Sequence, residues 1–221
     1  MNALVQWWDT NPITHLFFSL PAMKAAMPAI LKAFPVSIMF GLVSFLLAIP
    51  GGLTLSFMKM SKSRWLRWPA TIYVDVIRGT PLFLQILLVF FGLPLTPIYK
   101  TIVDAFALKQ YLFLGVDASI VWRGIMVLSL NSAAYMCEIF RAGIQSIPKG
   151  QSEAARSLGM TKTQTMAFVI LPQTVRRILP TMMSEFILLF KDTALLAAVS
   201  VAEVTLRAKE AAATSFNQSA Y

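Results

Sequence analysis

The sequence predicts an all-α integral membrane protein, and three observations support this prediction. First, 57% of the 221 residues are hydrophobic and 13% are charged, whereas a soluble domain is usually about 45–50% apolar and about 25% charged. Second, no charged residue occurs in Ala33–Met58 or in Gly79–Tyr99, and about 20 apolar residues suffice to cross a bilayer. Third, the basic residues gather in two segments that flank these apolar runs.

The uneven distribution of charge predicts the orientation of the chain. Lys59–Arg67 holds four basic residues and no acid, and Arg141–Arg177 holds six basic residues and one acid. The connection Gly92–Ser119 is balanced, with two lysines and two aspartates. Because cytoplasmic loops carry an excess of Lys and Arg, we expect the basic segments inside and the balanced connection outside. The net charge of +9 then requires no nucleic-acid partner.

Four membrane spans are expected, with a segment at either end. Trp7 and Trp8 favour the membrane–water interface, so the first 27 residues are expected to form an external interfacial segment. The membrane domain 28–204 is expected to hold four spans and a cytoplasmic loop, and an external C-terminal segment is expected to follow. The spans are 28–58, 69–92, 119–145 and 176–204, the loop is 146–171, and the last segment is 205–221.

Proline and glycine predict the breaks within these spans. Proline disfavours the helical conformation of the residue before it, so Thr80 is expected to interrupt the second span just ahead of Pro81. A bend is expected at Ile49–Gly52, where a proline is followed by two glycines. Pro172 is expected to break the helix that leads into the fourth span.

The cytoplasmic loop is expected to hold a short polar helix. Ser152 is a suitable N-cap, and Glu153 would then lie in the first turn, where an acid suits the helix dipole. Gly159 is expected to end the helix, because the left-handed conformation common at helix ends favours glycine. A second helix is expected to begin near 161–163.

Polar residues inside the spans are candidates for a solute pathway. An ionisable group in the bilayer costs about 2.5–3.5 kcal/mol on insertion scales and usually faces the bundle interior or a water-filled cavity. Asn131, Tyr135 and Glu138 recur at helical spacing on one face of the third span. Glu185 and Asp192 share a face of the fourth span.

A structural role for these charges stays open beside the pathway role. Residues three apart on a helix are neighbours, so Glu138 can pair with Arg141, and Asp75 can pair with Arg78. In that case the carboxylates stabilise the bundle and contact no solute.

The sequence shows no catalytic motif. It has no phosphate-binding G-x-x-x-x-G-K-[ST] loop, no G-x-S-x-G and no H-E-x-x-H. His15 and Cys137 are the sole residues of their types, so no metal site is expected. We therefore expect no enzymatic activity and no cofactor in this chain.

Six stretches of the sequence together form a recognisable pattern. In the longest, Ile147–Met160, Glu153-Ala154-Ala155 is followed four residues on by Gly159. The other stretches are Arg78–Leu82, Ala134–Tyr135, Glu138–Ile144, Ile170–Gln173 and Phe190–Leu195. Together they resemble the polar amino-acid branch of ABC importer permeases, the histidine/glutamine/glutamate/arginine group, and the longest stretch resembles the EAA pattern of bacterial ABC importers. The resemblance covers residues 70–205.

The resemblance implies a type I ABC importer (MetI-like) helical bundle of five spans in the bacterial inner membrane. Four spans are visible here, the fifth is absent from this chain, and we expect the sequence to be truncated at Tyr221. The partners implied are a second permease subunit, in a homo- or heterodimer, cytoplasmic ABC ATPase subunits and an external solute-binding protein. ATP and Mg would bind to the ATPase partners, and the complex would translocate a polar amino acid.

The resemblance also assigns roles to residues. Glu153, Ala154, Ala155 and Gly159 match the motif that couples the permease to its ATPase, and the small alanines would permit close docking of the helix in an ATPase groove. Asn131, Tyr135, Glu138, Glu185 and Asp192 remain the candidate pathway residues; of these, Glu138 and Asp192 match polar positions that the family keeps. An ATP-independent channel or an ion-coupled secondary transporter remains the alternative class.

Overall fold

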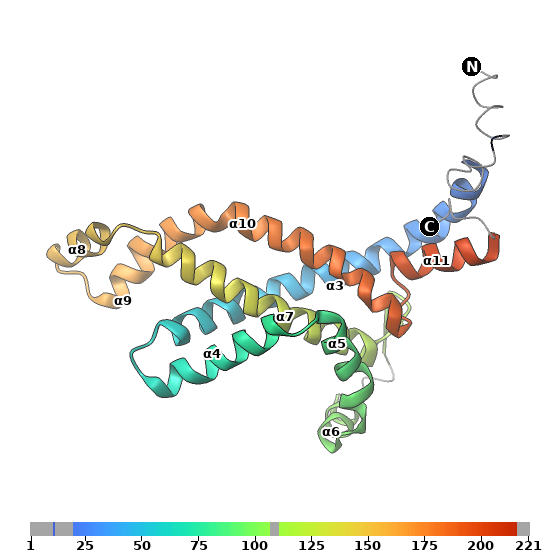
Figure 1. Cartoon of the computed structure of the whole chain (residues 1–221), viewed down its shortest axis with the longest axis horizontal. Helices are drawn as coiled ribbons and strands as arrows, with labels where there is room; N and C mark the ends of the chain where they lie inside the picture. The colour runs from blue at the N-terminus through green and yellow to red at the C-terminus, as the bar shows by residue number, and fades with distance from the viewer. Residues whose placement is uncertain (1–10, 12–19, 107–110, 216–221) are drawn as a thin grey trace. The chain divides into compact units, whose positions relative to one another are not determined.

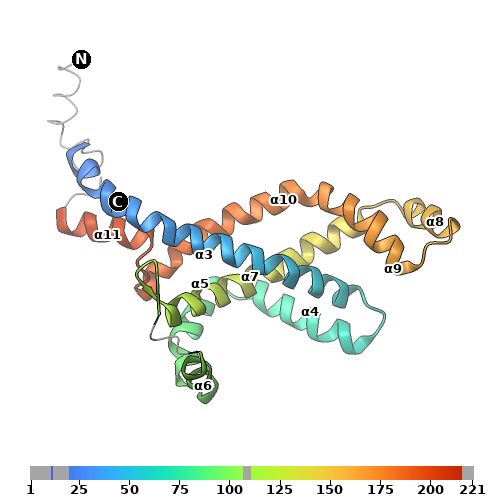
Figure 2. The same ribbon diagram turned by 180° about the vertical axis from the view of Figure 1, so that it is seen from behind.

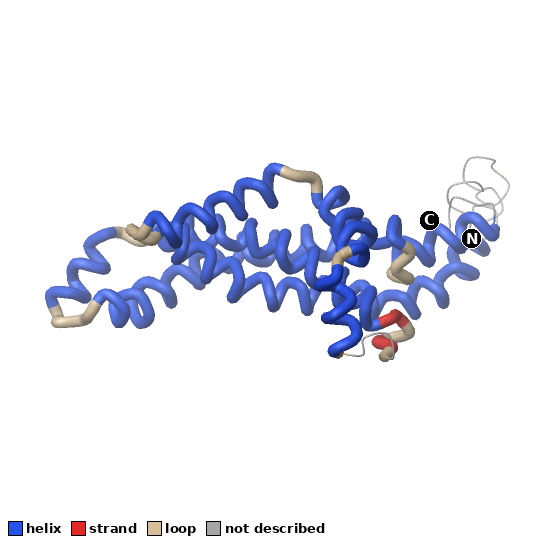
Figure 3. Tube along the Cα trace, turned by 90° about the horizontal axis from the view of Figure 1, so that it is seen from below, coloured by secondary structure: helices blue, strands red, loops and turns tan. Residues whose placement is uncertain are grey.

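The computed structural model describes residue 11 and residues 20–106 and 111–215. Figure 1 shows helices through most of this part, and Figure 3 shows its short strand pair in red. The predicted interfacial residues Trp7 and Trp8 lie outside the described residues, as do the last six residues of the predicted C-terminal segment. The helices and strands are α3 (Leu20–Met60), α4 (Arg64–Gly79), α5 (Leu82–Leu87), a π-helix (Leu88–Gly92), a 3-10 helix (Leu93–Leu95), α6 (Pro97–Ala105), β1 (Leu112–Phe113), β2 (Val116–Asp117), α7 (Ala118–Gln145), α8 (Lys149–Ser157), α9 (Lys162–Gln164), a π-helix (Thr165–Ile170), α10 (Leu171–Asp192), a 3-10 helix (Thr193–Val199) and α11 (Val204–Ser215).

The helices α3 and α7 are long and apolar enough to cross a membrane, over Ala22–Met60 and Ala118–Gln145. They correspond to the first and third predicted spans. The pair Arg64–Gly79 and Leu82–Leu95 would form one further span, bent by 104°. The break lies at Thr80, whose extended backbone has φ −117° and ψ 144°, as Pro81 predicts. The fourth predicted span overlaps α10, which begins earlier, at Leu171, ends at Asp192 and is followed by a 3-10 helix.

The chain divides into two units by its internal contacts. The first unit comprises Met1–Gly41, Ile86–Gly124 and Phe190–Tyr221, and the second comprises Leu42–Gln85 and Ile125–Leu189. The helices α3, α7 and α10 each contribute residues to both units.

The core of the second unit is formed by α3, α7 and α10, through Ala48, Ala133, Met136, Phe140, Ile178 and Met182. Small residues let the helices approach closely, as is usual in membrane bundles. A Cβ atom on Gly52 of α3 would lie 2.3 Å from the Cβ of Met136 on α7. The close crossing therefore requires glycine at position 52. The helix α3 continues without interruption through the predicted bend at Ile49–Gly52.

In the first unit, Arg123 of α7 holds the irregular segment that follows α5. Its Nη1 donates a hydrogen bond to the carbonyl of Phe90 at 2.9 Å, within the π-helix. Its guanidinium carbon lies 4.9 Å from the centre of the Phe90 ring and 5.5 Å from that of Tyr99. The arginine thus binds the backbone at the π-helix and stacks on two rings, so it stabilises a segment without regular α-helical hydrogen bonds.

A short hairpin leads into α7 in the first unit. The strands β1 and β2 pair antiparallel, and the turn between them consists of Leu114 and Gly115, both with positive φ, at 51° and 78°. Two positive φ values in sequence are typical of a tight hairpin turn. Asp117 then caps α7, because its Oδ1 accepts a hydrogen bond from the amide of Ser119 at 2.7 Å.

The helix α11 lies beside the N-terminal part of α3 within the first unit (Figures 1 and 2). Its start is held by Glu203, a carboxylate that is 1% exposed. Glu203 Oε1 accepts from the amide of Leu206 at 2.8 Å, and Oε2 accepts from the Ser37 hydroxyl at 3.4 Å. The Ser37 oxygen in turn accepts from the amide of Val204 at 3.2 Å. Glu203 and Ser37 therefore cap α11 together.

Candidate functional site

Glu138, on α7, is the centre of an ion-pair cluster in the second unit. Its Oε1 accepts a hydrogen bond from Lys59 Nζ at 2.6 Å, and its Oε2 accepts from Arg141 Nη2 at 2.6 Å. Lys59 Nζ also lies 3.5 Å from Asp75 Oδ1. The side chains of Lys59 and Glu138 are each 17% exposed, so both charges are largely withdrawn from water. The cluster connects the last turn of α3 to α4 and α7.

The predicted pairing of Glu138 with Arg141 is confirmed, whereas that of Asp75 with Arg78 is wrong. Asp75 contacts Lys59 instead, because the end of α3 brings the lysine within its reach. The guanidinium carbon of Arg78 lies 5.2 Å from the centre of the Tyr135 ring, where a cation is attracted by the π electrons.

A cavity of about 460 Å³ lies beside this cluster in the second unit. It brings together three of the predicted pathway residues, Tyr135, Glu138 and Glu185. Two arginines that the sequence did not single out for the pathway, Arg78 and Arg177, also line it. The wall thus carries groups of both charges. The remaining lining residues are Ile139, Ala142, Gly143, Ser146, Ile178 and Thr181.

Hydrogen bonds between helices hold the charged groups of this wall. Glu185 of α10 accepts from the Ser132 hydroxyl of α7 at 2.9 Å. Arg177 of α10 donates to the carbonyl and, at 3.1 Å, to the hydroxyl oxygen of Ser146, just after α7. The two helices approach closely here, since a Cβ on Gly143 would lie 2.2 Å from a methyl carbon of Ile178. The wall is therefore an ordered part of the helix packing.

The other two predicted pathway residues do not line this cavity. Asn131 is 6% exposed, and its Nδ2 donates to Gln85 Oε1 at 3.0 Å. Gln85 in turn donates to the carbonyls of Ile77 and Thr80, at the break between α4 and α5. Asn131 thus stabilises the broken helix. Asp192 ends α10 in the first unit.

The predicted coupling helix is α8, and its motif residues differ in exposure. Glu153 and Ala154 are exposed, whereas Ala155 is only 5% exposed. The helix packs against the π-helix Thr165–Ile170 (Figure 1). Ala155 therefore faces the chain itself. The motif residues that a partner could contact are Glu153, Ala154 and Gly159, which are exposed.

Gly159 ends α8 as the sequence predicts. Its φ of 85° is left-handed. The amide of Gly159 donates to the carbonyl of Arg156, and the amide of Met160 donates to that of Ala155. These two bonds form a Schellman motif, which satisfies the last carbonyls of the helix. Thr161 then begins α9 with a capping box formed with Gln164.

Three predictions about this loop are wrong. The helix α8 begins at Lys149 after Pro148, so Ser152 is not its N-cap and Glu153 does not lie in its first turn. The Ser152 hydroxyl donates to the carbonyl of Lys149. Proline suits the start of a helix because it has no amide hydrogen to leave unpaired. Pro172 does not break the helix either. It follows a π-helix, where the amide of Leu171 bonds to the carbonyl of Met166, and this wider turn accommodates the proline.

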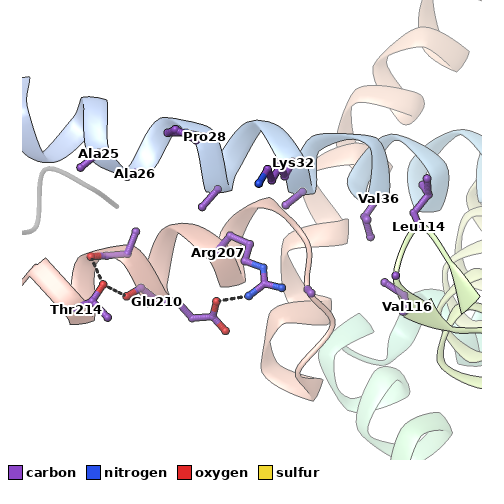
Figure 4. A pocket seen from close by; sticks show the side chains of 15 residues that line it. Ala25, Ala26, Pro28, Lys32, Val36, Leu114, Val116, Arg207, Glu210 and Thr214 are labelled. Carbon is purple, nitrogen blue, oxygen red and sulfur yellow. Dashed lines mark hydrogen bonds and ion pairs between the residues drawn. The ribbon is translucent and has the colours of Figure 1, made fainter.

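A second cavity, of about 690 Å³, lies in the first unit between α3, α11 and the hairpin turn (Figure 4). Alanine is the most frequent residue of its walls, which also carry Lys32 on α3 and an ion pair between Arg207 and Glu210 at 2.7 Å on α11. None of the predicted pathway residues lines it. The cavity beside Glu138 is therefore the candidate pathway site.

Residues 48–221 match the family described as "Binding-protein-dependent transport system inner membrane component". The chain is 37% identical over 191 residues to the arginine transport system permease protein ArtQ of Bacillus subtilis (strain 168), over 86% of this chain and 80% of ArtQ. The L-cystine transport system permease protein TcyB of the same organism is 37% identical over 177 residues, 80% of this chain and 68% of TcyB. A chain in the crystal structure of an amino acid ABC transporter with histidines aligns at a TM-score of 0.73 and 32% identity, over 90% of this chain and 85% of that one.

The chain belongs to the amino-acid ABC permeases of this family. The expected type I importer fold is confirmed, and within the described part of the chain α3 and α7 are unbroken apolar spans. The permease is a transport subunit of a membrane complex.

Proposed function

We propose that this permease carries a polar amino acid inward across the bacterial inner membrane, as one subunit of an ATP-driven importer. The relatives ArtQ and TcyB are named for arginine and cystine transport. The cavity beside Glu138 supports a polar solute, because its wall carries both acidic and basic groups. An amino acid presents a carboxylate and an ammonium group, and a wall of mixed charge suits both.

Within this proposal, the cavity residues divide into two roles. Tyr135 and Glu185 line the route of the solute, with Arg78 beside Tyr135. Glu138 positions the wall, since Lys59 and Arg141 each hold one of its oxygens. Asn131 positions Gln85 at the helix break, and Asp192 remains a pathway prediction outside this cavity.

The energy for transport would come from partner subunits. ATP and Mg would bind to cytoplasmic ABC ATPase subunits, which would dock on the exposed Glu153 and Ala154 of α8. An external solute-binding protein would deliver the amino acid, and a second permease subunit would complete the route. The Schellman motif at Gly159 supports this proposal, because it gives the docking helix a defined end.

An ATP-independent channel or secondary transporter is the competing class. Such a protein would need the polar cavity. It would not need a short helix such as α8, which lies in the loop between α7 and α10 and exposes a glutamate and an alanine. The exposed α8 therefore favours the ATP-coupled class.

Ala154→Trp tests the coupling role. The large side chain on an exposed position should block docking and lower ATP-dependent uptake into proteoliposomes by at least about tenfold, which corresponds to 1.4 kcal/mol of coupling. Co-purification of the ATPase should fall with it. Ala155→Trp is unsuitable here, because Ala155 is buried and a large side chain would disturb α8 itself.

Ala213→Trp on α11 is the matched control, since Ala213 is exposed and remote in sequence from the loop. It should leave ATPase co-purification unchanged. Normal uptake and normal co-purification in Ala154→Trp would overturn the coupling role, and uptake by the permease without any ATPase would favour the competing class.

A further inference from the structure

Two tryptophans at the start of α4 are strongly exposed in the second unit. The side chains of Trp65 and Trp68 are exposed by 86% and 66%. They lie one turn apart and line a groove of about 390 Å³ together with Arg64 and Pro69. Large aromatic side chains that remain exposed in the chain itself are expected to meet an apolar or amphipathic partner.

Three basic residues lie beside the two tryptophans in the sequence, and one of them, Arg64, lines the groove. Lys62, Arg64 and Arg67 are exposed, and none of them forms an ion pair among the described residues. The next acid along the chain is Asp75, which contacts Lys59. We call Lys62, Arg64, Trp65, Arg67 and Trp68 the basic–tryptophan patch. It combines unneutralised positive charge with an apolar groove.

The position of the patch in the sequence indicates what covers it. Only three residues, Ser61–Ser63, separate α4 from the end of the membrane-spanning helix α3. The patch therefore follows directly on a segment that reaches the membrane surface. Tryptophan is enriched at that level of the bilayer, and basic clusters next to a membrane helix attract anionic lipids.

We propose that the basic–tryptophan patch binds the phosphate headgroup of an anionic phospholipid. Arg64 and Arg67 would bind the phosphate oxygens, because the planar guanidinium presents paired donors that match phosphate. The indole rings of Trp65 and Trp68 would lie at the level of the lipid glycerol, between the headgroup and the acyl chains. This site is separate from the cavity beside Glu138 and from the coupling helix, so it does not depend on the proposed transport function.

Quenching by brominated lipids tests this proposal with the tryptophans as reporters. The full chain, with Trp7, Trp8 and Trp122 changed to Phe, is placed in nanodiscs that contain brominated phosphatidylglycerol or, at the same mole fraction, brominated phosphatidylcholine. The anionic lipid should quench the fluorescence about twofold more strongly, as expected for enrichment of anionic lipid near basic residues. In Arg64→Gln/Arg67→Gln the two lipids should quench equally.

Lys149→Gln/Arg156→Gln is the matched control, because it removes the same charge from exposed positions of α8. It should retain the stronger quenching by the anionic lipid. Native mass spectrometry of the chain with all its tryptophans provides a second measurement, in which the wild type should retain anionic lipid and Arg64→Gln/Arg67→Gln should lose it.

Three outcomes would overturn the proposal. Equal quenching by both lipids in the reporter chain, together with no retained anionic lipid in the wild type, would show that the patch has no affinity for the anionic headgroup. Loss of the lipid difference on addition of inorganic phosphate would identify a site for free phosphate. Loss of lipid quenching in a complex assembled with the ATPase would identify the patch as a protein interface.

Discussion

Each of the two units holds a carboxylate that is largely shielded from water, but the groups that bind the carboxylate differ. In the second unit, each oxygen of Glu138 is bound by a cation, from Lys59 and Arg141, at 2.6 Å. In the first unit, Glu203 is buried more deeply, and it accepts from neutral donors, the Ser37 hydroxyl and the amide of Leu206. The start of α11 also favours negative charge through the helix dipole. A shielded acid can therefore stabilise the fold either by forming ion pairs or by capping a helix.

Glu138→Gln should have the largest effect on stability. Removal of one partner from a largely buried ion pair leaves the other charges uncompensated, and we expect a loss of about 3 kcal/mol. The measurement is thermal unfolding of the purified complex, with amino-acid uptake measured in parallel. A fall in stability and assembly without a change in substrate selectivity would agree with a positioning role.

Tyr135→Ala is the counterpart, because Tyr135 lines the same cavity without an ion pair. It should raise the half-saturating substrate concentration while the melting temperature changes little. If Glu138→Gln instead shifts the half-saturating substrate concentration at unchanged stability, Glu138 contacts the solute. Glu138 and Glu203 would then differ in function and not only in the groups that bind them.

Glu203→Ala should have the second largest effect. It removes the N-cap of α11, worth about 1 kcal/mol, and leaves the Ser37 hydroxyl and the Leu206 amide without their acceptor, so we expect a loss of about 2 kcal/mol in total. Hydrogen exchange at the first amides of α11 should accelerate. Glu203→Gln keeps an acceptor oxygen and should lose less than half as much. Equal damage from both variants would show that the negative charge itself is required, as at Glu138.

Asp117 extends the comparison to a carboxylate outside the spans, and its removal should have the smallest effect on stability of the three carboxylates. Burial raises the pKa of Asp117, but hydrogen bonds from Ser119 and from the amide of Ile120 outweigh it, so the pKa lies below its usual value. A carboxyl with a lowered pKa stabilises the fold above its ordinary pKa of about 3.9, and this contribution is lost as the pH falls through the lowered value.

We therefore expect Asp117→Ala to lower stability by about 1 kcal/mol at pH 7, the usual value for a lost N-cap. The difference from the wild type should shrink as the pH falls below about 3.9. Thermal unfolding in buffers from pH 7 to pH 3 measures this. A difference that stays constant over the whole range would show that the charge of Asp117 contributes nothing to the cap.

The features that were predictable from the sequence depend on local chemistry. Thr80 before Pro81 breaks a helix, Gly159 ends one, and Glu138 pairs with a residue one turn away. These outcomes follow from backbone geometry and helical spacing, and both can be inferred from a short stretch of sequence. The fold class followed likewise from the length of the charge-free runs.

The features that were missed depend on packing between distant residues. Glu203 is held by Ser37, 166 residues away, and nothing near Glu203 in the sequence indicates that Ser37 is its donor. Lys59 reaches Glu138 from another helix. Ala155 belongs to a docking motif by sequence, yet it packs against its own chain. Helical spacing indicates which residues share a face of a helix, but it does not indicate which other part of the protein packs against that face.

The π-helix Thr165–Ile170 fixes the rotation of α8, the predicted coupling helix, about the axis of α10. Each of its turns holds about one residue more than an α-helical turn, and one residue corresponds to about 100° of rotation about the helix axis. Thr174, Ile178 and Met182 are buried on one face of α10. Without the extra residue, α8 and the rest of its loop would be rotated relative to that face. Deletion of a single residue from this π-helix would therefore change the direction in which α8 points, although every side chain of α8 would stay the same.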